Sequence, residues 1–489
     1  MTDTATTAPA PTDIEQATAR RNRLVITLLL ISGFVVILNE TIMGVAIPNL
    51  MDDLGITAGA AQWLTTAFLL TMAVVIPITG FLLQRFHTRS VFIAAMTLFS
   101  AGTAIAAIAP GFEVLLLARV VQASGTAIMM PLLFTTVLNL VPPARRGAIM
   151  GNISIVISVA PALGPTISGI ILNYLDWRWM FILVLPIAIA SLVLGVTFMK
   201  NVTEPRPGRF DVLSVILSAL GFGGLIFGLS NIGEAGIAAM ASWMPLLVGA
   251  AALTAFVLRQ RFLARTDDAL LDLRTFSNAN FRLSIILIAF AMMTMFGTII
   301  LLPIYMQRVL ELDALTTGLM LLPGGLAMGL LAPFVGRIFD RHGPRALLVV
   351  GSVVISAVLW GMTMLDENTE TWWIVIAHVS LSIGLALMFT PLFTAGLSSL
   401  APALYSHGSA IVGTTQQVAG AAGTALFITV MSAQSAGLIA GGTAAIPAMA
   451  AGIHTAFVYG AVLSLALIPL AFLVKRPPAA ADGAEFAAH

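Results

Sequence analysis

The sequence predicts an all-α polytopic membrane protein with fourteen transmembrane helices, arranged as two six-helix bundles with two inserted central helices. Three observations predict this fold. Of 489 residues, 59% are apolar and 9% are charged, whereas soluble chains average about 25% charged residues. Apolar runs of membrane-crossing length recur along the whole chain, and one six-span unit occurs twice. The absence of cysteine excludes disulfides and thiolate metal sites.

Each apolar run approaches or exceeds the ~20 residues that a helix needs to cross the hydrocarbon core. Inside lipid these runs must be helical, because irregular backbone would leave amide groups unpaired. In chain order, we expect helices near residues 24–47, 60–84, 91–109, 114–139, 147–173, 178–199, 210–230, 241–262, 281–306, 315–336, 346–365, 372–398, 408–435 and 451–474.

These spans divide the chain into five parts. The first apolar span is too long for a signal-peptide core and has no small-residue cleavage site, so we expect nothing to be removed. The predicted parts are a polar N-terminal tail (1–23), a first six-helix bundle (24–199), two inserted helices with their linkers (200–280), a second six-helix bundle (281–474) and a C-terminal tail (475–489).

The positions of the basic residues predict the orientation. If the N-terminus is cytoplasmic and the loops alternate, 20 of the 23 Lys and Arg residues lie on the cytoplasmic side, as the positive-inside rule requires. A missed or extra helix would invert every later loop and remove this bias. We therefore expect fourteen spans with both termini in the cytoplasm.

A six-span unit occurs twice in the sequence. The loop at residues 80–89, after the second span, is similar to the loop at residues 336–345, after the tenth. Parallel repeats of this kind imply two halves that rock about a site near the membrane midplane. Two further pairs stand at equivalent positions, 259 residues apart: Arg119 with His378, and Gly164 with Gly423.

Four motifs fall on matching spans: residues 38–48 in span one, the two repeated loops, residues 119–125 in span four and residues 160–169 in span five. Together they resemble the major facilitator superfamily, and within it the fourteen-helix drug:proton antiporter branch (EmrB/QacA-like). The resemblance covers residues 20–475. It implies a major facilitator fold and proton-coupled export of lipophilic small molecules (multidrug efflux) across the bacterial plasma membrane by alternating access.

Two departures from the family pattern stand out. The first-span motif usually has Asp where this chain has Asn39, and Glu40 follows one residue later. One residue turns a side chain by about 100° on a helix, so the acid is expected to face differently. The 80–89 loop has Gln84 instead of Asp and Thr88 instead of Gly, so only the 336–345 copy is complete.

The residues of the repeated loops predict a conformational latch. Asp340 precedes span eleven, so its negative charge can stabilise the N-terminus of that helix and pair with Arg341 or Arg345. Gly343 supplies a residue that can adopt the left-handed conformation in the turn. Ordinary loop capping would explain the same pattern. The residues assigned to the latch are Gly80, Arg85, Arg89, Asp340, Arg341, Gly343 and Arg345.

Span five carries the antiporter motif residues Pro161, Gly164, Pro165 and Gly169. The two prolines lack amide donors and favour a bend, and Gly169 allows close helix packing. That such a bend favours antiport by sealing a leak path is what the resemblance implies.

Glu40 and Arg119 are the charged residues well inside predicted spans. Their positions place them ~12 Å and ~8 Å deep, where a charge costs from about 2.5 kcal/mol upward. We expect both to face one interior, where movement of Arg119 would control protonation of Glu40. Alternatives are a permanent ion pair, or Arg119 bound to nearby backbone carbonyls. His378, at the same level in the other half, is either a third titrating group or an ordinary hydrogen-bonding histidine.

Polar uncharged residues on expected interior faces predict the substrate pathway, for which the candidates are Asn39, Gln122, Gln416 and Gln417, together with Met292 of span nine. Methionines adapt to varied ligands, although core packing is the better explanation of Met292. No metal cluster, nucleotide-binding loop or catalytic triad is evident in the sequence. We therefore expect no enzyme activity, no cofactor beyond the proton gradient, no nucleic-acid partner and a functional monomer. The alternatives are an uptake symporter or uniporter of the same superfamily, or a non-transporting membrane enzyme or receptor.

Overall fold

The computed structural model describes residues 13–201, 205, 210–230 and 239–477. Parts of both predicted tails (1–12 and 478–489), and Arg206 and Arg209 of the loop that we expect to be cytoplasmic, lie outside the described residues. The helices, in chain order, are α1 (Asp13–Leu54), α2 (Ala58–Arg85), α3 (Thr88–Ala107), α4 (Phe112–Leu140), η1 (Pro143–Arg145), α5 (Arg146–Tyr174), α6 (Trp179–Phe198), α7 (Val212–Ser230), α8 (Ala239–Leu263), η2 (Leu273–Ser277), α9 (Ala279–Arg308), α10 (Ala314–His342), α11 (Arg345–Met362), α12 (Thr371–Ser398), η3 (Pro402–Leu404), α13 (Tyr405–Ala440), α14 (Ala445–Ser464) and α15 (Leu467–Leu473).

Within the described residues, fourteen helical segments are long and apolar enough to cross a membrane, which confirms the predicted all-α membrane fold. Two boundaries differ from the prediction. Helix α1 begins at Asp13, inside the predicted tail, because the Glu, Gln, Ala and Arg residues there are good helix formers. The last span is divided into α14 and α15. Pro469 is the third residue of α15, where its missing amide falls among donors that have no partner inside the helix.

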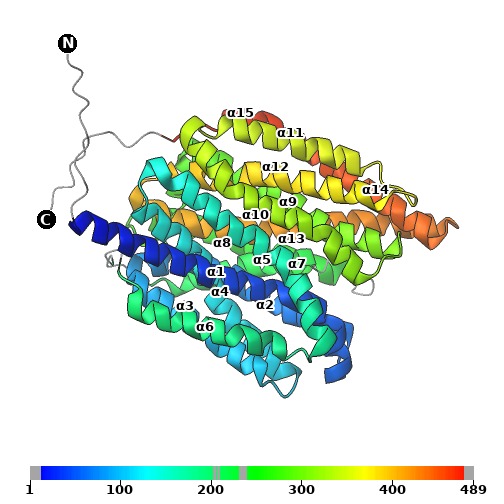
Figure 1. The fold of residues 1–489 in the computed structure, drawn as a ribbon, viewed down its shortest axis with the longest axis horizontal. Helices are drawn as coiled ribbons and strands as arrows, with labels where there is room; N and C mark the ends of the chain where they lie inside the picture. The colour runs from blue at the N-terminus through cyan, green and yellow to red at the C-terminus, as the bar shows by residue number, and fades with distance from the viewer. Residues whose placement is uncertain (1–12, 202–204, 206–209, 231–238, 478–489) are drawn as a thin grey trace, which may run out of the picture.

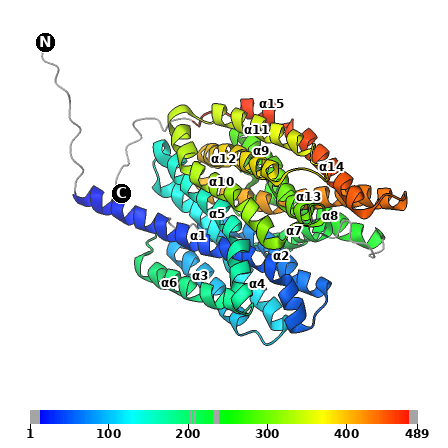
Figure 2. The ribbon, with the colours of Figure 1, turned by 45° about the vertical axis from the view of Figure 1, so that its right-hand side comes forward.

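The helices form two bundles (Figures 1 and 2). Helices α1, α3, α4 and α6 lie on one side of the molecule, and α9, α11, α12 and α14 lie on the other. Helix α5 packs along α10, and α2 packs against α13, so these two pairs join the halves. The inserted helices α7 and α8 pack on each other, and α7 also contacts α2 and α13. They therefore flank one of the two seams between the halves.

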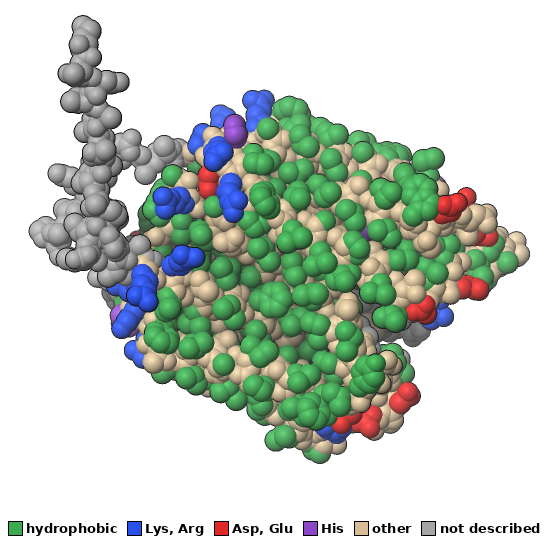
Figure 3. Space-filling model, viewed as in Figure 1, with side chains coloured by type: hydrophobic (Ala, Val, Ile, Leu, Met, Phe, Trp, Pro, Cys, Tyr) green, Lys and Arg blue, Asp and Glu red, His purple; other side chains and the backbone are tan. Residues whose placement is uncertain are grey.

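Charged side chains gather at opposite ends of the helices (Figure 3). Lys and Arg lie mainly at one end, Asp and Glu lie mainly at the other, and apolar side chains cover the surface between them. We call the first the basic end; it holds the α2–α3, α4–α5, α8–α9 and α10–α11 connections. The opposite end is called the acidic end. A broad apolar surface between two charged ends suits a chain that crosses a bilayer.

Candidate functional site

Arg119 occupies the centre of a buried polar cluster in the first half. Its guanidinium donates from Nη1 to Gln122 Oε1 at 2.6 Å and to Asn39 Oδ1 at 3.3 Å, and lies 4.0 Å from the centre of the Phe68 ring. Gln122 Nε2 in turn donates to Thr103 Oγ1 at 2.8 Å. Arg119 is 1% exposed, and Asn39 and Gln122 are fully buried. The cluster therefore joins α1, α3 and α4 by neutral acceptors around one buried cation.

Glu40 lies next to this cluster without joining it. Its carboxylate interacts electrostatically with Arg119, but no salt bridge between the two occurs among the described residues. Asn39 takes the position facing Arg119, and Glu40 is partly accessible. Because the acid stands one residue later than in the family pattern, Asn39 and not Glu40 accepts the hydrogen bond from the guanidinium. In this conformation Arg119 is held by side-chain amides, which is neither the predicted ion pair nor binding to backbone carbonyls.

The third residue predicted to take part in proton coupling, His378, lies apart from the Arg119 cluster. His378 of α12 packs on Gly324 of α10, so close that a Cβ at position 324 would lie 2.3 Å from its ring. No described contact joins His378 to Glu40 or Arg119, and its Nδ1 is enclosed without a partner. The His378 side chain therefore lies in the second half, between α10 and α12.

The residues predicted to line the substrate pathway fall into a buried group and an accessible group. Met292 is 1% exposed and belongs to the packed core, whereas Gln416 and Gln417 on α13 are partly accessible. Gln417 Nε2 approaches Met72 Sδ of α2 at 3.8 Å, across the two halves. Asn39 and Gln122 are engaged with Arg119, so the two glutamines of α13 are the accessible members of the predicted set.

Asp340 connects the two halves at the basic end. Its Oδ1 accepts the backbone N–H of Gly147 at 2.8 Å, and its Oδ2 accepts that of Ala148 at 2.9 Å. Both amides belong to the first turn of α5, where N–H groups have no partner inside the helix and the helix dipole favours an anion. The carboxylate therefore caps a helix that lies 193 residues earlier in the chain.

This contact corrects the partners predicted for Asp340. The carboxylate binds the start of α5 in the other half, not the start of α11, and forms no ion pair with Arg341 or Arg345 among the described residues. The cause is the close approach of α5 and α10: a Cβ at Gly336 would lie 2.1 Å from the Gly147 carbonyl oxygen. Two glycines allow the backbones to meet, so the carboxylate can reach the α5 amides.

The remaining latch residues make contacts at the same end. Gly80 packs on His407 of α13, and the neighbouring Gln84 donates to the Ala403 carbonyl oxygen at 2.8 Å. Gly343 has φ 81°, the predicted left-handed conformation. The loop arginines contact their own half: Arg85 lies over Phe81, Arg89 donates to the Val196 carbonyl, Arg345 lies over Phe472, and the Arg341 carbonyl accepts from Arg476.

Repeat-equivalent residues meet where the halves join. Arg146 Nη1 donates to Tyr405 Oη at 3.2 Å, and these residues are 259 positions apart. Phe134 and Phe393 have the same separation, and their ring centres are 5.3 Å apart. Equivalent residues can contact each other only near an axis that relates the two halves. The repeat spacing in the sequence would have identified both pairs, although neither was singled out there.

The described hydrogen bonds between the halves lie at the basic end or in the middle of the helices, including Ser154 Oγ to Thr390 Oγ1 at 2.8 Å. At the acidic end, the polar contacts of the described residues stay within one half. Asp53 accepts from Trp177 Nε1 at 2.7 Å and from Arg178 at 3.3 Å. These donors, Trp177 foremost, hold the pKa of Asp53 below its ordinary value. The described hydrogen bonds therefore join the halves at the basic end and in the middle of the helices, and not at the acidic end.

The two glycines of the span-five motif have different surroundings. A Cβ at Gly164 would lie 2.2 Å from Thr41 Oγ1, so α5 and α1 are in close contact there. Gly169 has open space around its Cβ position, which contradicts the predicted close packing at that residue. Pro161 and Pro165 lie inside α5, which continues from Arg146 to Tyr174.

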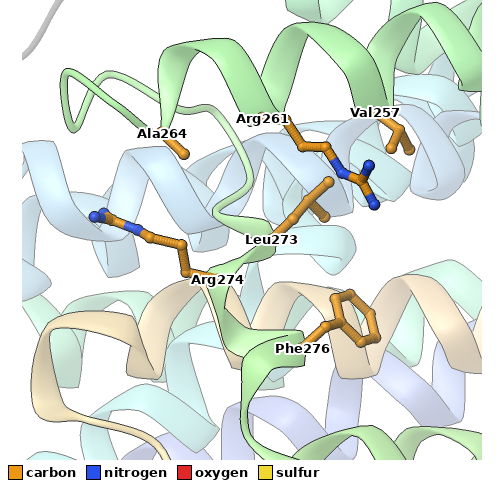
Figure 4. A pocket seen from close by; sticks show the side chains of 6 residues that line it. All are labelled: Val257, Arg261, Ala264, Leu273, Arg274 and Phe276. Atoms are coloured by element: carbon orange, nitrogen blue, oxygen red, sulfur yellow. The ribbon is translucent and has the colours of Figure 1, made fainter.

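A cavity of about 390 Å³ opens at the basic end between α8 and the segment around η2 (Figure 4). Val257 and Arg261 come from α8, Ala264 directly follows that helix, and Leu273, Arg274 and Phe276 come from the facing segment η2. None of these residues belongs to the Arg119 cluster. This cavity is therefore separate from the predicted proton-coupling residues.

Comparison with known proteins defines the class. The sequence profile of the Major Facilitator Superfamily matches residues 29–424, and the chain belongs to this superfamily of membrane transporters. It is 42% identical over 471 residues to the uncharacterized MFS-type transporter YcnB of Bacillus subtilis (strain 168), covering 96% of this chain and 98% of YcnB. It is also 42% identical over 445 residues to the lincomycin resistance protein LmrB of Listeria monocytogenes, covering 90% and 94% of the two chains.

A solved structure agrees with the fold. The human organic anion transporter MFSD10 superposes with a TM-score of 0.67 at 14% identity, covering 92% of this chain and 99% of MFSD10. At this identity the match concerns the fold alone. Together with the profile match, it confirms the predicted superfamily and a multi-pass membrane transporter.

Proposed function

We propose that this transporter exports lipophilic small molecules in exchange for protons across a bacterial plasma membrane, with its basic end in the cytoplasm. The observation that carries the proposal is the buried Arg119 cluster beside the partly accessible carboxyl group of Glu40, which forms no salt bridge among the described residues. The name of the relative LmrB makes lincomycin the first substrate to test. The proton gradient supplies the energy, no other cofactor is required, and one chain suffices.

The proton step follows from the position of Glu40. A carboxyl group inside the membrane is costly when charged, so its protonation state depends on how near Arg119 approaches. When the helices move so that the guanidinium leaves the amide oxygens of Asn39 and Gln122, it becomes free to pair with Glu40 and expel the proton. When Arg119 returns to the amides, Glu40 is again able to take up a proton.

The conformational step uses the contacts at the basic end. In the proposed cycle, Asp340 stabilises the state in which the cytoplasmic side is closed, by capping α5. Substrate enters from the cytoplasm after this contact breaks and leaves on the acidic side after it forms again. The accessible Gln416 and Gln417 on α13 provide neutral hydrogen-bonding groups along this path, which suits substrates of varied structure.

The direction of coupling is measurable in proteoliposomes that contain a pH-sensitive dye. For an antiporter, adding lincomycin to one side drives protons toward that side, and a proton gradient drives lincomycin against its own gradient. Cotransport in the same direction would establish the rival symporter, and lincomycin movement without protons would establish a uniporter. Glu367→Gln, in an exposed loop, is the matched control for Glu40→Gln, since both remove one carboxylate.

A further inference from the structure

A second cavity at the basic end, of about 440 Å³, lies where α10 ends, α11 begins and α15 ends. Four basic or titratable side chains line it: His342, Arg345, Lys475 and Arg476. None of its described lining residues is acidic. The cavity is therefore built to accept negative charge.

Among the described residues, the positive charge in this cavity is largely uncompensated. Arg345 stacks on Phe472 at 5.6 Å, and neither Arg345 nor Lys475 forms a salt bridge among the described residues. Arg476 donates to the Asp340 backbone oxygen at 2.8 Å and also interacts with the Asp340 carboxylate. Arg345 and Lys475 are therefore the cations that remain for a ligand.

The cavity in Figure 4 offers a direct contrast at the same end of the molecule. Its Arg274 is held by Asp272 at 2.6 Å and by Asp267 at 2.5 Å. Two carboxylates thus neutralise that arginine, and Arg261 is the other cation lining the space. The two cavities have similar volumes but differ in net charge. Of the two, only the cavity beside α15 has a clear excess of positive charge among its described residues.

Apolar side chains border the uncompensated cations. Phe472 and Leu473, the last residues of α15, are 46% and 54% exposed and line the same cavity. Helix α11 begins beside them at Arg345 without a side-chain cap, so amide donors also face this region. A free phosphate ion would use the cations alone. A phospholipid would use both the cations and the exposed apolar surface.

We propose that this cavity binds the phosphate headgroup of an anionic phospholipid from the leaflet at the basic end. Arg345 and Lys475 pair with the phosphate, and the acyl chains lie along Phe472 and Leu473. Basic groups at a membrane surface attract anionic lipids by about 1 kcal/mol each. The site is independent of the substrate that the transporter carries.

The test is a titration of the purified full-length protein with phosphatidylglycerol, followed by native mass spectrometry, with phosphatidylcholine as the neutral lipid. The Arg345→Gln/Lys475→Gln variant is expected to bind phosphatidylglycerol about 30-fold more weakly, and Lys475→Gln alone about 5-fold. The Lys475 side chain is exposed, so the single variant is expected to fold normally. Phosphatidylcholine has the same phosphate but carries a compensating choline cation, so it should bind more weakly and lose less affinity than phosphatidylglycerol in both variants.

The matched control is Arg261→Gln/Arg265→Gln, which removes two cations from the same end of the molecule. It should retain phosphatidylglycerol binding. An equal loss in this control would show that general surface charge attracts the lipid and would overturn the site. Unchanged binding in the Arg345→Gln/Lys475→Gln variant would overturn it as well. Displacement of phosphatidylglycerol by millimolar glycerol 3-phosphate would assign the cavity to a soluble phosphate and refute the lipid assignment.

Discussion

Replacing Asp340 by Asn tests whether the contact between α10 and α5 controls the conformation. Asn keeps one acceptor oxygen but presents an amide N–H to the second α5 donor. The variant therefore loses one charge-assisted hydrogen bond, worth about 1.5–3 kcal/mol, and the attraction of a full charge to the helix terminus. Because Asp340 is only half-buried, we expect a net loss of about 2 kcal/mol. That shifts the balance between the two conformations roughly 30-fold toward the state open at the basic end.

The chain has no native cysteine, so spin labels can be introduced directly. Gly169→Cys on α5 and Gly318→Cys on α10 have open space around their Cβ positions, and both lie near the acidic ends of their helices. Pulsed EPR should show one main distance in the parent protein. Asp340→Asn should add a shorter distance, as the acidic ends approach. In transport assays, the maximal rate should fall more than substrate affinity.

Gln84→Ala is the matched control, since Gln84 is the repeat equivalent of Asp340. Gln84 donates a neutral hydrogen bond to the Ala403 carbonyl, worth about 1 kcal/mol, so the expected shift is only about 5-fold. An unchanged distance distribution in Asp340→Asn would refute the reasoning. So would an equal shift in Gln84→Ala, because the charge at the α5 terminus would then have no special effect.

Three further predictions concern the proton site and the helix contact. Glu40→Gln should abolish proton-driven efflux without lowering the yield of folded protein, because Gln keeps the size of Glu but cannot change charge; efflux at the parent rate would move the proton site elsewhere, with His378 the next candidate. Arg119→Lys should lower the efflux rate about 10-fold or more, since Lys loses the planar donors that reach two amide oxygens; full activity would mean that charge alone matters. Gly336→Ala should destabilise the state joined at the basic end by about 1–3 kcal/mol, because its Cβ would lie 2.1 Å from the Gly147 carbonyl oxygen. The same EPR pair measures this effect, and an unchanged spectrum would show that α5 and α10 tolerate a methyl group between them.

The number and order of the spans could be predicted from the sequence because they depend on local chemistry. Each apolar run must become helical in lipid to pair its own amides, and fourteen such segments occur among the described residues. The repeat was also visible, and the structure supports it at Gly423, where α13 closely approaches α9 as α5 approaches α1 at Gly164. The left-handed residue Gly343 follows from its place in the loop motif.

Tertiary structure alone decided which groups meet. Asp340 binds amides 193 residues away, because two glycines on different helices let α5 and α10 approach, and no local pattern reports such a contact. The rotation of α1 likewise decided that Asn39 faces Arg119 while Glu40 lies beside it. Close helix packing was predicted at Gly169, yet of these two motif glycines only Gly164 has a neighbouring helix against it. A sequence determines which segments cross the membrane through the chemistry of each segment by itself, whereas the partner of a side chain depends on the packing of all of them together.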